Sequence, residues 1–260
     1  MGIFGKIKKF FEYSFTIKED APPLTPGQER GLALGAIYAA EGHLPINALT
    51  AEADPVTAAK VVGGAWQATD TASARASYRY LLERGHRGIY QLVAPHVENL
   101  WSGVSGSRKE LKAHYARATD ELAAQAVQYG LDPAEVQHYA TSWGRCTAAL
   151  EKALPAPRAA SIAAWDAARV VHVSRLFVDA GFIEPDEAWE AIGRAVELAE
   201  PRYSSWEGFT RGFLAGRAFW QAGQESYPDA EKISSSVGTF TFHADELLTR
   251  EDSPWRRVAW

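Results

Sequence analysis

The chain of 260 residues contains a single cysteine, Cys146. One thiol cannot form a disulfide within the chain and is compatible with a reducing compartment, so we expect a cytoplasmic protein. Cys146 follows Trp143 and Gly144 in a predicted helix, a setting typical of a small residue packed in the core. A nucleophilic thiol is the less favoured interpretation.

Long apolar runs are also missing. No stretch reaches the roughly 18 apolar residues that a membrane-spanning helix needs. Lys6, Lys8 and Lys9 interrupt the apolar N-terminal stretch and no small-residue cleavage site follows, so the sequence predicts no secretory signal. The net charge of −5 gives no general attraction to nucleic acid, and we predict no nucleic-acid partner.

The signatures of common catalytic and cofactor sites are absent as well. The seven histidines form no H-E-x-x-H pair, and Glu135-x-x-His138 is half of a di-iron motif that needs a second copy. No phosphate-binding glycine loop occurs, and Gly103-Val104-Ser105-Gly106 departs by one residue from the nucleophile elbow of hydrolases. We therefore predict no metal and no cofactor, and the chain leans away from an enzyme.

What the sequence contains is apolar periodicity of the helical kind. Three predicted helices follow one another in the middle of the chain. The first begins near Ser161 and ends at Gly181, and the second opens at Glu184. The third begins at Ser204 or Ser205, where Ser204 and Glu207 fit a capping box.

Three glycines in the third of these helices recur every four residues. Glycine in a helix interior costs about 0.5–1 kcal/mol relative to alanine, so an aligned row needs a reason. We expect another backbone to pack closely against Gly208, Gly212 and Gly216.

The rest of the chain also reads as helical up to its last forty residues. Beyond Trp220 the pattern weakens, and we expect a loop over 234–238, an extended segment over 238–242 and a helical turn over 244–249. The tail ends in Trp255 and Trp260 and should lie in a surface groove. Further helices are predicted over 25–40, 56–66, 70–84, 88–100, 107–129 and 132–153.

These elements predict an all-α fold, a compact multi-helix bundle of about ten helices with a short irregular C-terminal tail. Residues 21–260 form one helical domain, and the Gly/Ser-rich loop at 102–107 suggests 25–102 and 107–260 as alternative halves.

Residues 1–20 precede this domain as a basic amphipathic helix. Its apolar side chains would dock on a partner, on a membrane surface or back onto the domain itself. These residues are Ile3, Phe4, Ile7, Phe10 and Phe11.

A polar cluster is predicted within the central helices. Asp166 and Glu207 each follow a tryptophan, and each has an arginine at helical spacing, Arg169 and Arg211; Arg217 adds a third cation. The cluster is either an ion-pair network that holds the helices in register or a cleft for an anion or for acid–base chemistry. We favour the first interpretation and expect Asp166 to pair with Arg217, Arg169 or both.

Several motifs taken together resemble the bacterial YbeU/YbeR-like family, domain of unknown function 1266. The resemblance spans roughly residues 25 to 260 and implies a shared fold and core, without an established activity. It rests on Trp66, Glu83-Arg84-Gly85-His86-Arg87, Trp165-Asp166-x-x-Arg169, Gly181-Phe182-Ile183-x-x-x-Glu187-Ala188-Trp189, Ser204-Ser205-Trp206-Glu207, Gly216-Arg217-x-Phe219-Trp220, Ser253-Pro254-Trp255 and Trp260.

The missing catalytic signatures and the aromatic-rich helical core favour a non-catalytic cytoplasmic protein that binds another protein. An immunity or adaptor protein of a bacterial toxin or secretion system is one form of this hypothesis. The alternative is an enzyme or a small-anion-binding protein that uses a carboxylate/arginine cleft.

Overall fold

The structure is a computed structural model that describes residues 13–150, 153–156, 158–225 and 227–260. Over these ranges the chain forms α-helices, one short π-helix and one short 3-10 helix (Glu200–Arg202), and it contains no strand. The predicted all-α fold is therefore confirmed. No helix in the described ranges is long and apolar enough to cross a membrane.

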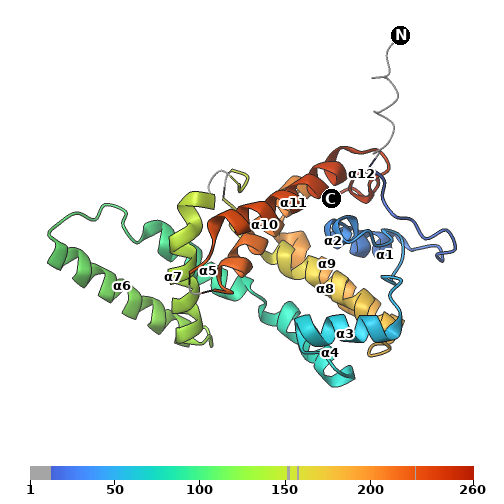
Figure 1. Cartoon of the computed structure of the whole chain (residues 1–260), viewed down its shortest axis with the longest axis horizontal. Coiled ribbons are helices and arrows are strands. Elements are labelled where there is room, and N and C mark those ends of the chain that lie inside the picture. The colour runs from blue at the N-terminus through green and yellow to red at the C-terminus, as the bar shows by residue number, and fades with distance from the viewer. Residues whose placement is uncertain (1–12, 151–152, 157, 226) are drawn as a thin grey trace, which may run out of the picture.

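Helix α8 (Ala163–Asp179) lies at the centre of the molecule (Figure 1). Fourteen of its 17 residues are buried, so α8 is enclosed on all sides rather than on one stripe. Its neighbours are α1 (Pro26–Leu34), α2 (Ala36–Glu41), α3 (Pro55–Trp66), α9 (Pro185–Ala199) and α10 (Trp206–Ala222).

The central helices begin and end close to the predicted residues, but the cap of α10 differs. Ser205 is the N-cap, and its hydroxyl accepts a hydrogen bond from the Gly208 N–H at 3.1 Å. The predicted capping box between Ser204 and Glu207 was wrong by one residue, because the two adjacent serines offer the same side chain and only Ser205 has the cap position.

The glycine row of α10 has mixed causes. A Cβ at Gly216 would lie 2.3 Å from the Cβ of Trp165, so the glycine lets α10 approach α8 closely. A Cβ at Gly212 would instead meet the side chain of Tyr203. A Cβ at Gly208 would have no neighbouring atom closer than 3.7 Å. The expected close approach therefore holds at one glycine of the three.

Two predicted helices of the N-terminal part are split. The one over 25–40 breaks at Gly35 into α1 and α2. A Cβ at Gly35 would lie 2.5 Å from Cγ1 of Val171 on α8, so only glycine fits there. The one over 70–84 consists of α4 (Thr71–Arg79), capped by Asp70, followed by the π-helix Tyr80–Arg84.

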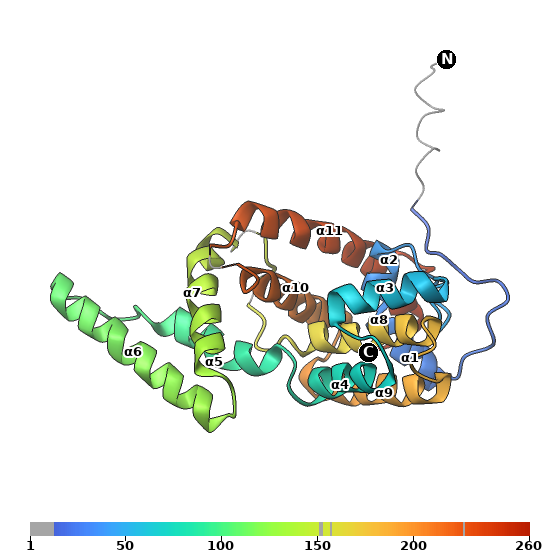
Figure 2. The same ribbon diagram turned by 60° about the horizontal axis from the view of Figure 1, so that its bottom comes forward.

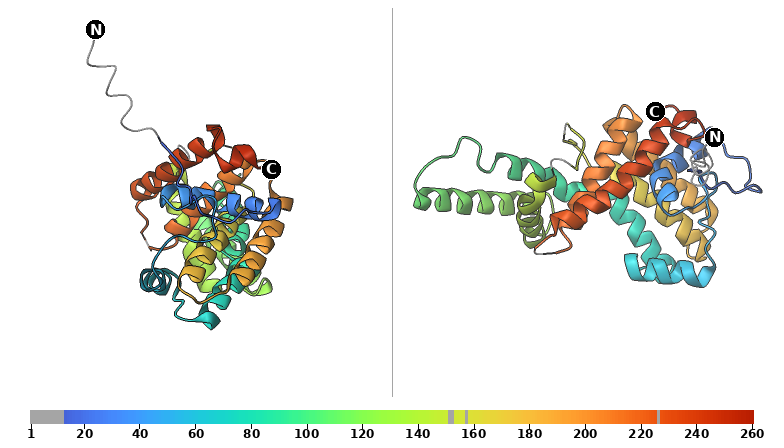
Figure 3. Two further views of the ribbon diagram at one scale, coloured as in Figure 1. Left: turned by 90° about the vertical axis from the view of Figure 1, so that its right-hand side faces the viewer. Right: turned by 45° about the horizontal axis from the view of Figure 1, so that its top comes forward.

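Three helices form an arm beside the central group. In Figures 2 and 3, α6 and the loop before it extend away from the rest of the molecule. The Ser107–Glu110 capping box begins α6 as predicted, and α5 packs against both α6 and α7, so contacts cross the loop at 102–107. The bounds are α5 Arg87–Asn99, α6 Arg108–Gln128 and α7 Pro133–Leu150.

The C-terminal part is more regular than expected. Residues Ala230–Thr249 form one helix, α11, so the predicted loop and extended segment over 234–242 were wrong. The hydroxyls of Thr239 and Thr241 donate hydrogen bonds to backbone carbonyls four residues earlier. Phe240 packs against Phe213 of α10. Packing of one helical face thus overrides the strand-like composition.

The irregular tail is limited to the residues around α12 (Pro254–Arg257). Trp255 stacks on Trp206 at 5.0 Å between ring centroids, and its indole N–H donates to the carbonyl of Ala33 at 2.7 Å. The indole of Trp260 donates to the carbonyl of Tyr203. The two tryptophans of the tail thus pack against α1, Tyr203 and Trp206.

The predicted N-terminal helix is not helical where the structure describes it. Residues 13–18 have no regular secondary structure, Phe15 is buried, and the Tyr13 hydroxyl lies 3.0 Å from Nδ1 of His243 on α11. The predicted docking residues Ile3, Phe4, Ile7, Phe10 and Phe11 lie outside the described residues, so that hypothesis stays a prediction.

Candidate functional site

Asp166 is the centre of a buried ion cluster. Its carboxylate is fully buried and forms ion pairs with Arg169 on the same helix and with Arg87 at 3.0 Å. It also accepts hydrogen bonds from the backbone N–H groups of His86 and Arg87, both at 3.2 Å. The expected pair with Arg169 is present, and the second cation comes from the start of α5.

Gly85 makes this arrangement possible. Its φ of 57° lies in the region that favours glycine, and a Cβ there would lie 2.0 Å from Oδ2 of Asp166. The turn between the π-helix and α5 thus brings two backbone donors against the carboxylate. The Glu83–Arg87 motif of the sequence is this turn.

Of the two arginines predicted as partners of Asp166, Arg169 pairs with it and Arg217 does not. The Nε of Arg217 donates to the Ser236 hydroxyl on α11 at 3.0 Å, and its guanidinium carbon lies 4.9 Å from the centre of the Trp220 ring. Among the described residues no carboxylate lies within 4 Å of it. The second cation beside Asp166 is Arg87. Spacing within the central helices could not indicate it, because Arg87 lies outside them.

Glu207 and Arg211 also lie apart from the cluster. Glu207 is exposed in the first turn of α10, where the backbone and the Ser205 hydroxyl lower the pKa of its carboxyl group. Arg211 borders a small hollow near Tyr90 and Trp143. The five predicted residues therefore do not form one site.

A cavity of about 590 Å³ lies beside the buried cluster. Arg169 and Arg217 both line it, together with side chains from α2, α3, α4 and α10. Most of the large lining side chains are aromatic, and several of these are partly exposed. The lining includes Tyr38, Trp66, Tyr80, Trp165, His172 and Trp220, with Ser73, Ser77 and His86.

Polar atoms of the lining lack partners within the described chain. The indole nitrogen of Trp165, Nε of Arg169 and Nδ1 of His172 are buried, and none has a hydrogen bond. Trp165 and Arg169 are 2% and 5% exposed, so these atoms are held away from bulk water. Buried polar groups without partners are rare in folded proteins, and several at one cavity indicate a place for a bound molecule.

The two histidines of the cavity do not add charge at neutral pH. Burial, reinforced by the guanidinium of Arg169, lowers the pKa of His86 to about 3. Burial and Arg175 lower the pKa of His172 to about 4. Of the three guanidinium groups at the cluster and the cavity, Arg87 and Arg169 pair with Asp166, and Arg217 forms no ion pair within the described residues.

A family model described as "Protein of unknown function (DUF1266)" matches residues 62–260. The chain belongs to the DUF1266 family. Curated proteins and solved structures give no match.

The DUF1266 match begins in α3, later than the resemblance predicted from residue 25 onward. Of the residues that line the cavity, Tyr38 on α2 lies outside the matched region. Trp66, Arg169 and Arg217 lie within it. The cavity is thus a feature of the DUF1266 region, completed by one ring from the N-terminal helices.

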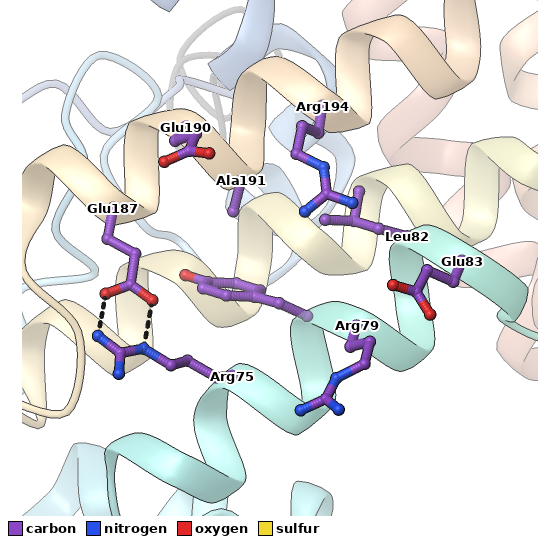
Figure 4. Close-up of a pocket in the computed structure, with 9 residues that line it drawn as sticks. Arg75, Arg79, Leu82, Glu83, Glu187, Glu190, Ala191 and Arg194 are labelled. Atoms are coloured by element: carbon purple, nitrogen blue, oxygen red, sulfur yellow. Dashed lines mark hydrogen bonds and ion pairs between the residues drawn. The ribbon is translucent and has the colours of Figure 1, made fainter.

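A second, smaller cleft lies on the other side of α4 (Figure 4). It has a volume of about 280 Å³ between α4, the π-helix and α9. Arg75 and Glu187 form a two-pronged ion pair across it, at 2.7 and 2.8 Å, and Arg79, Glu83, Glu190 and Arg194 surround it. Paired, exposed charges of this kind contribute little energy, so we place the candidate site in the larger cavity.

The remaining candidates for chemistry in this DUF1266 chain are a metal site and the thiol of Cys146. The described residues include no group of three or more His, Cys, Asp or Glu side chains that could hold a metal ion. Cys146 is buried, and burial raises the pKa of its thiol to about 11, so it stays protonated near neutral pH. A buried thiol of this kind fits packing and not attack on a substrate.

The sequence could have indicated some cavity residues and not others. Arg87 and His86 stand in the motif Glu83–Arg87, which was noted for the family resemblance but not for the cluster. Trp66 was noted only for the family resemblance, and Tyr38 and His172 were not singled out, because only the packing of α2 and α3 on α8 brings the three together.

Proposed function

We propose that this protein binds a small organic anion in the cavity between α3, α4, α8 and α10. The observation that carries the proposal is Arg217, a half-buried guanidinium among aromatic rings with no carboxylate within 4 Å in the described chain. Burial lowers the pKa of this guanidinium, so an anionic partner would stabilise its charged form. The cavity volume is in the range of small-molecule sites.

The test is a binding screen with matched variants. The purified full chain is heated with a panel of carboxylates, phosphates, sulfates and their neutral analogues, and hits are measured by calorimetry. We expect anions to raise the melting temperature of the wild type and of Arg211→Gln, but not of Arg217→Gln. Arg211 lies on the same helix away from the cavity, so it controls for loss of one charge. Failure of every anion in the panel to bind the wild type would refute the proposal.

A second candidate function is binding of another protein through the arm. Trp101 and Tyr115 are about half exposed, stack at 6.2 Å with an angle of 12° between the rings, and border a hollow of about 450 Å³. Exposed aromatic side chains of this kind are enriched at protein interfaces. This observation supports the hypothesis of a protein that binds another protein, of which a cytoplasmic immunity or adaptor protein is one form.

Affinity capture of the native complex tests this second candidate. The bait is the wild type or the double variant Trp101→Ser and Tyr115→Ser, and bound proteins are identified by mass spectrometry. A partner that is retained by the wild type and lost by the double variant supports the arm as an interface. Identical sets of bound proteins would remove the arm from consideration.

A further inference from the structure

If the proposed anion binding holds, the free Nη groups of Arg217 indicate which class of anion the cavity binds. The Nε of Arg217 is occupied by Ser236, and neither Nη has a hydrogen bond in the described chain. The outer edge of a guanidinium offers two parallel N–H donors, which match the two oxygens of a carboxylate. Arg169 differs, because its Nη2 already bonds to Asp166 and His86, and its Nε is buried without a hydrogen bond.

The surroundings favour a carboxylate over a phosphate. Phosphate sites commonly use the backbone N–H groups of a helix N-terminus or a glycine loop. Two helix N-termini beside the cavity already bind a carboxylate. Asp70 caps α4 by accepting from Ser73 N–H at 2.8 Å, and the N–H groups of His86 and Arg87 at the start of α5 donate to Asp166. A second anion would be repelled there, so the anionic group is left to the guanidinium edge.

The walls favour a flat ring on the rest of the ligand. Trp66 and Trp220 each have a guanidinium carbon above the ring, Arg169 at 5.5 Å and Arg217 at 4.9 Å. Tyr38 and Tyr80 add two more rings that line the same cavity. Aromatic and guanidinium planes stack on planar molecules, whereas a saturated ring offers only general apolar contact.

We infer that the ligand of this cavity is an aromatic carboxylate, with its carboxylate on the Nη edge of Arg217 and its ring among the cavity's tryptophan and tyrosine side chains. Trp165 and Arg169 each provide one additional buried donor. The specificity then has two separable parts, one for negative charge and one for planarity.

Four compounds with one carbon skeleton separate these parts: 2-naphthoate, its neutral amide 2-naphthamide, the saturated decahydro-2-naphthoate and 2-naphthyl phosphate. Each is titrated into the full chain by calorimetry. We expect 2-naphthoate to bind most tightly, with the amide weaker by at least about tenfold because the charged hydrogen bonds are lost. The saturated acid should be weaker by about tenfold because ring stacking is lost. The phosphate should also be weaker than 2-naphthoate.

Protein variants provide the matching half of the experiment. Arg217→Gln should weaken 2-naphthoate by at least about tenfold and should remove its preference over the amide. Arg211→Gln should change the affinity by less than about twofold, as expected for a surface substitution away from the ligand. Loss of the acid–amide preference is a readout that simple destabilisation of the protein would not produce.

The outcomes distinguish this inference from the proposed function. Equal binding of the acid and the amide, equal binding of the flat and the saturated acid, or tighter binding of the phosphate would each overturn the aromatic carboxylate. If 2-naphthoate fails while another anion of the wider panel binds, the inference is wrong and the proposed function stands. If no anion binds at all, both are wrong.

Discussion

Helices α8 and α6 have similar lengths, 17 and 21 residues, but lie in opposite environments. Fourteen residues of α8 are buried, including Asp166, Arg169 and Arg175, whereas α6 buries only Leu122 and Ala126. Charged side chains inside a protein need partners, so α8 holds its neighbours in fixed positions. The arm with α6 depends on few contacts. We therefore expect substitutions on α8 to change stability strongly and those on the surface of α6 to change it little.

The largest effect is expected for Asp166→Asn. It leaves the buried Arg87 and Arg169 without their carboxylate and should lower the free energy of unfolding by about 3–5 kcal/mol, measured by urea denaturation. The effect should couple to Arg169→Met, which touches it, and should add to that of Arg217→Gln within about 0.5 kcal/mol. Strong coupling between Asp166 and Arg217 would contradict the separation of the two arginines.

The second largest effect is expected from acidification, which should lower the free energy of unfolding through His86 and His172. The pKa values of His86 and His172 are lowered on folding to about 3 and about 4, from an ordinary value of 6.5. At a pH between the folded and the unfolded pKa values, the unfolded chain binds more protons than the folded chain. The stabilisation is therefore complete above about pH 6.5 and is lost as the pH falls.

From pH 7.5 to pH 5 each histidine should contribute a loss of about 2 kcal/mol. Urea denaturation at a series of pH values measures it. His172→Phe, which keeps a ring against Tyr38, should remove about half of the pH dependence. An unchanged slope in this variant would show that His172 is not the source.

A smaller effect is expected at the crossing of α8 and α10. Gly216→Ala would place a Cβ 2.3 Å from that of Trp165 and should cost about 1–3 kcal/mol by overpacking. Gly193→Ala on α9 is the control, because no atom lies within 4 Å of the new Cβ. This control should leave stability unchanged or raise it by up to about 1 kcal/mol, since alanine favours the helix. Equal effects of the two substitutions would argue against a close approach at Gly216.

The smallest effect should come from the arm. Val127 on α6 is 66% exposed, and Val127→Ser should change the unfolding free energy by less than about 0.5 kcal/mol. The same urea series measures this value. A loss above 1 kcal/mol would mean that the arm is packed more tightly than its burial pattern shows, and the contrast with α8 would weaken.

The sequence predicted those parts of the fold that depend on neighbouring residues. The capping box of Ser107 and Glu110, the first-turn Pro185 and the stop near Gly181 act within a few residues, and the helices begin and end close to them. Helix α11 was missed, because its Thr, Val and Phe content favours strands and only contacts such as Phe240 with Phe213 decide the outcome.

The candidate site was less predictable, because its partners are far apart in the chain. Asp166 and Arg169 are three residues apart and were paired correctly. Arg87 is 79 residues away from Asp166, and nothing at either position indicates the other. Arg217 was one of the two partners predicted for Asp166, but its actual surroundings depend on how α10 and α11 pack, which spacing within one helix does not determine.

The contacts between the C-terminal tail and α1 have a consequence for synthesis of the chain. The indole of Trp255 bonds to Ala33, and Arg30 lies 4.7 Å from the ring centre of Trp260 and forms an ion pair with Glu200. A ribosome makes α1 first, yet its contacts on α8, α9 and α12 all emerge more than a hundred residues later. The apolar face of α1 is therefore covered only after α8 and α9 have been synthesised, and its contacts with α12 form later still.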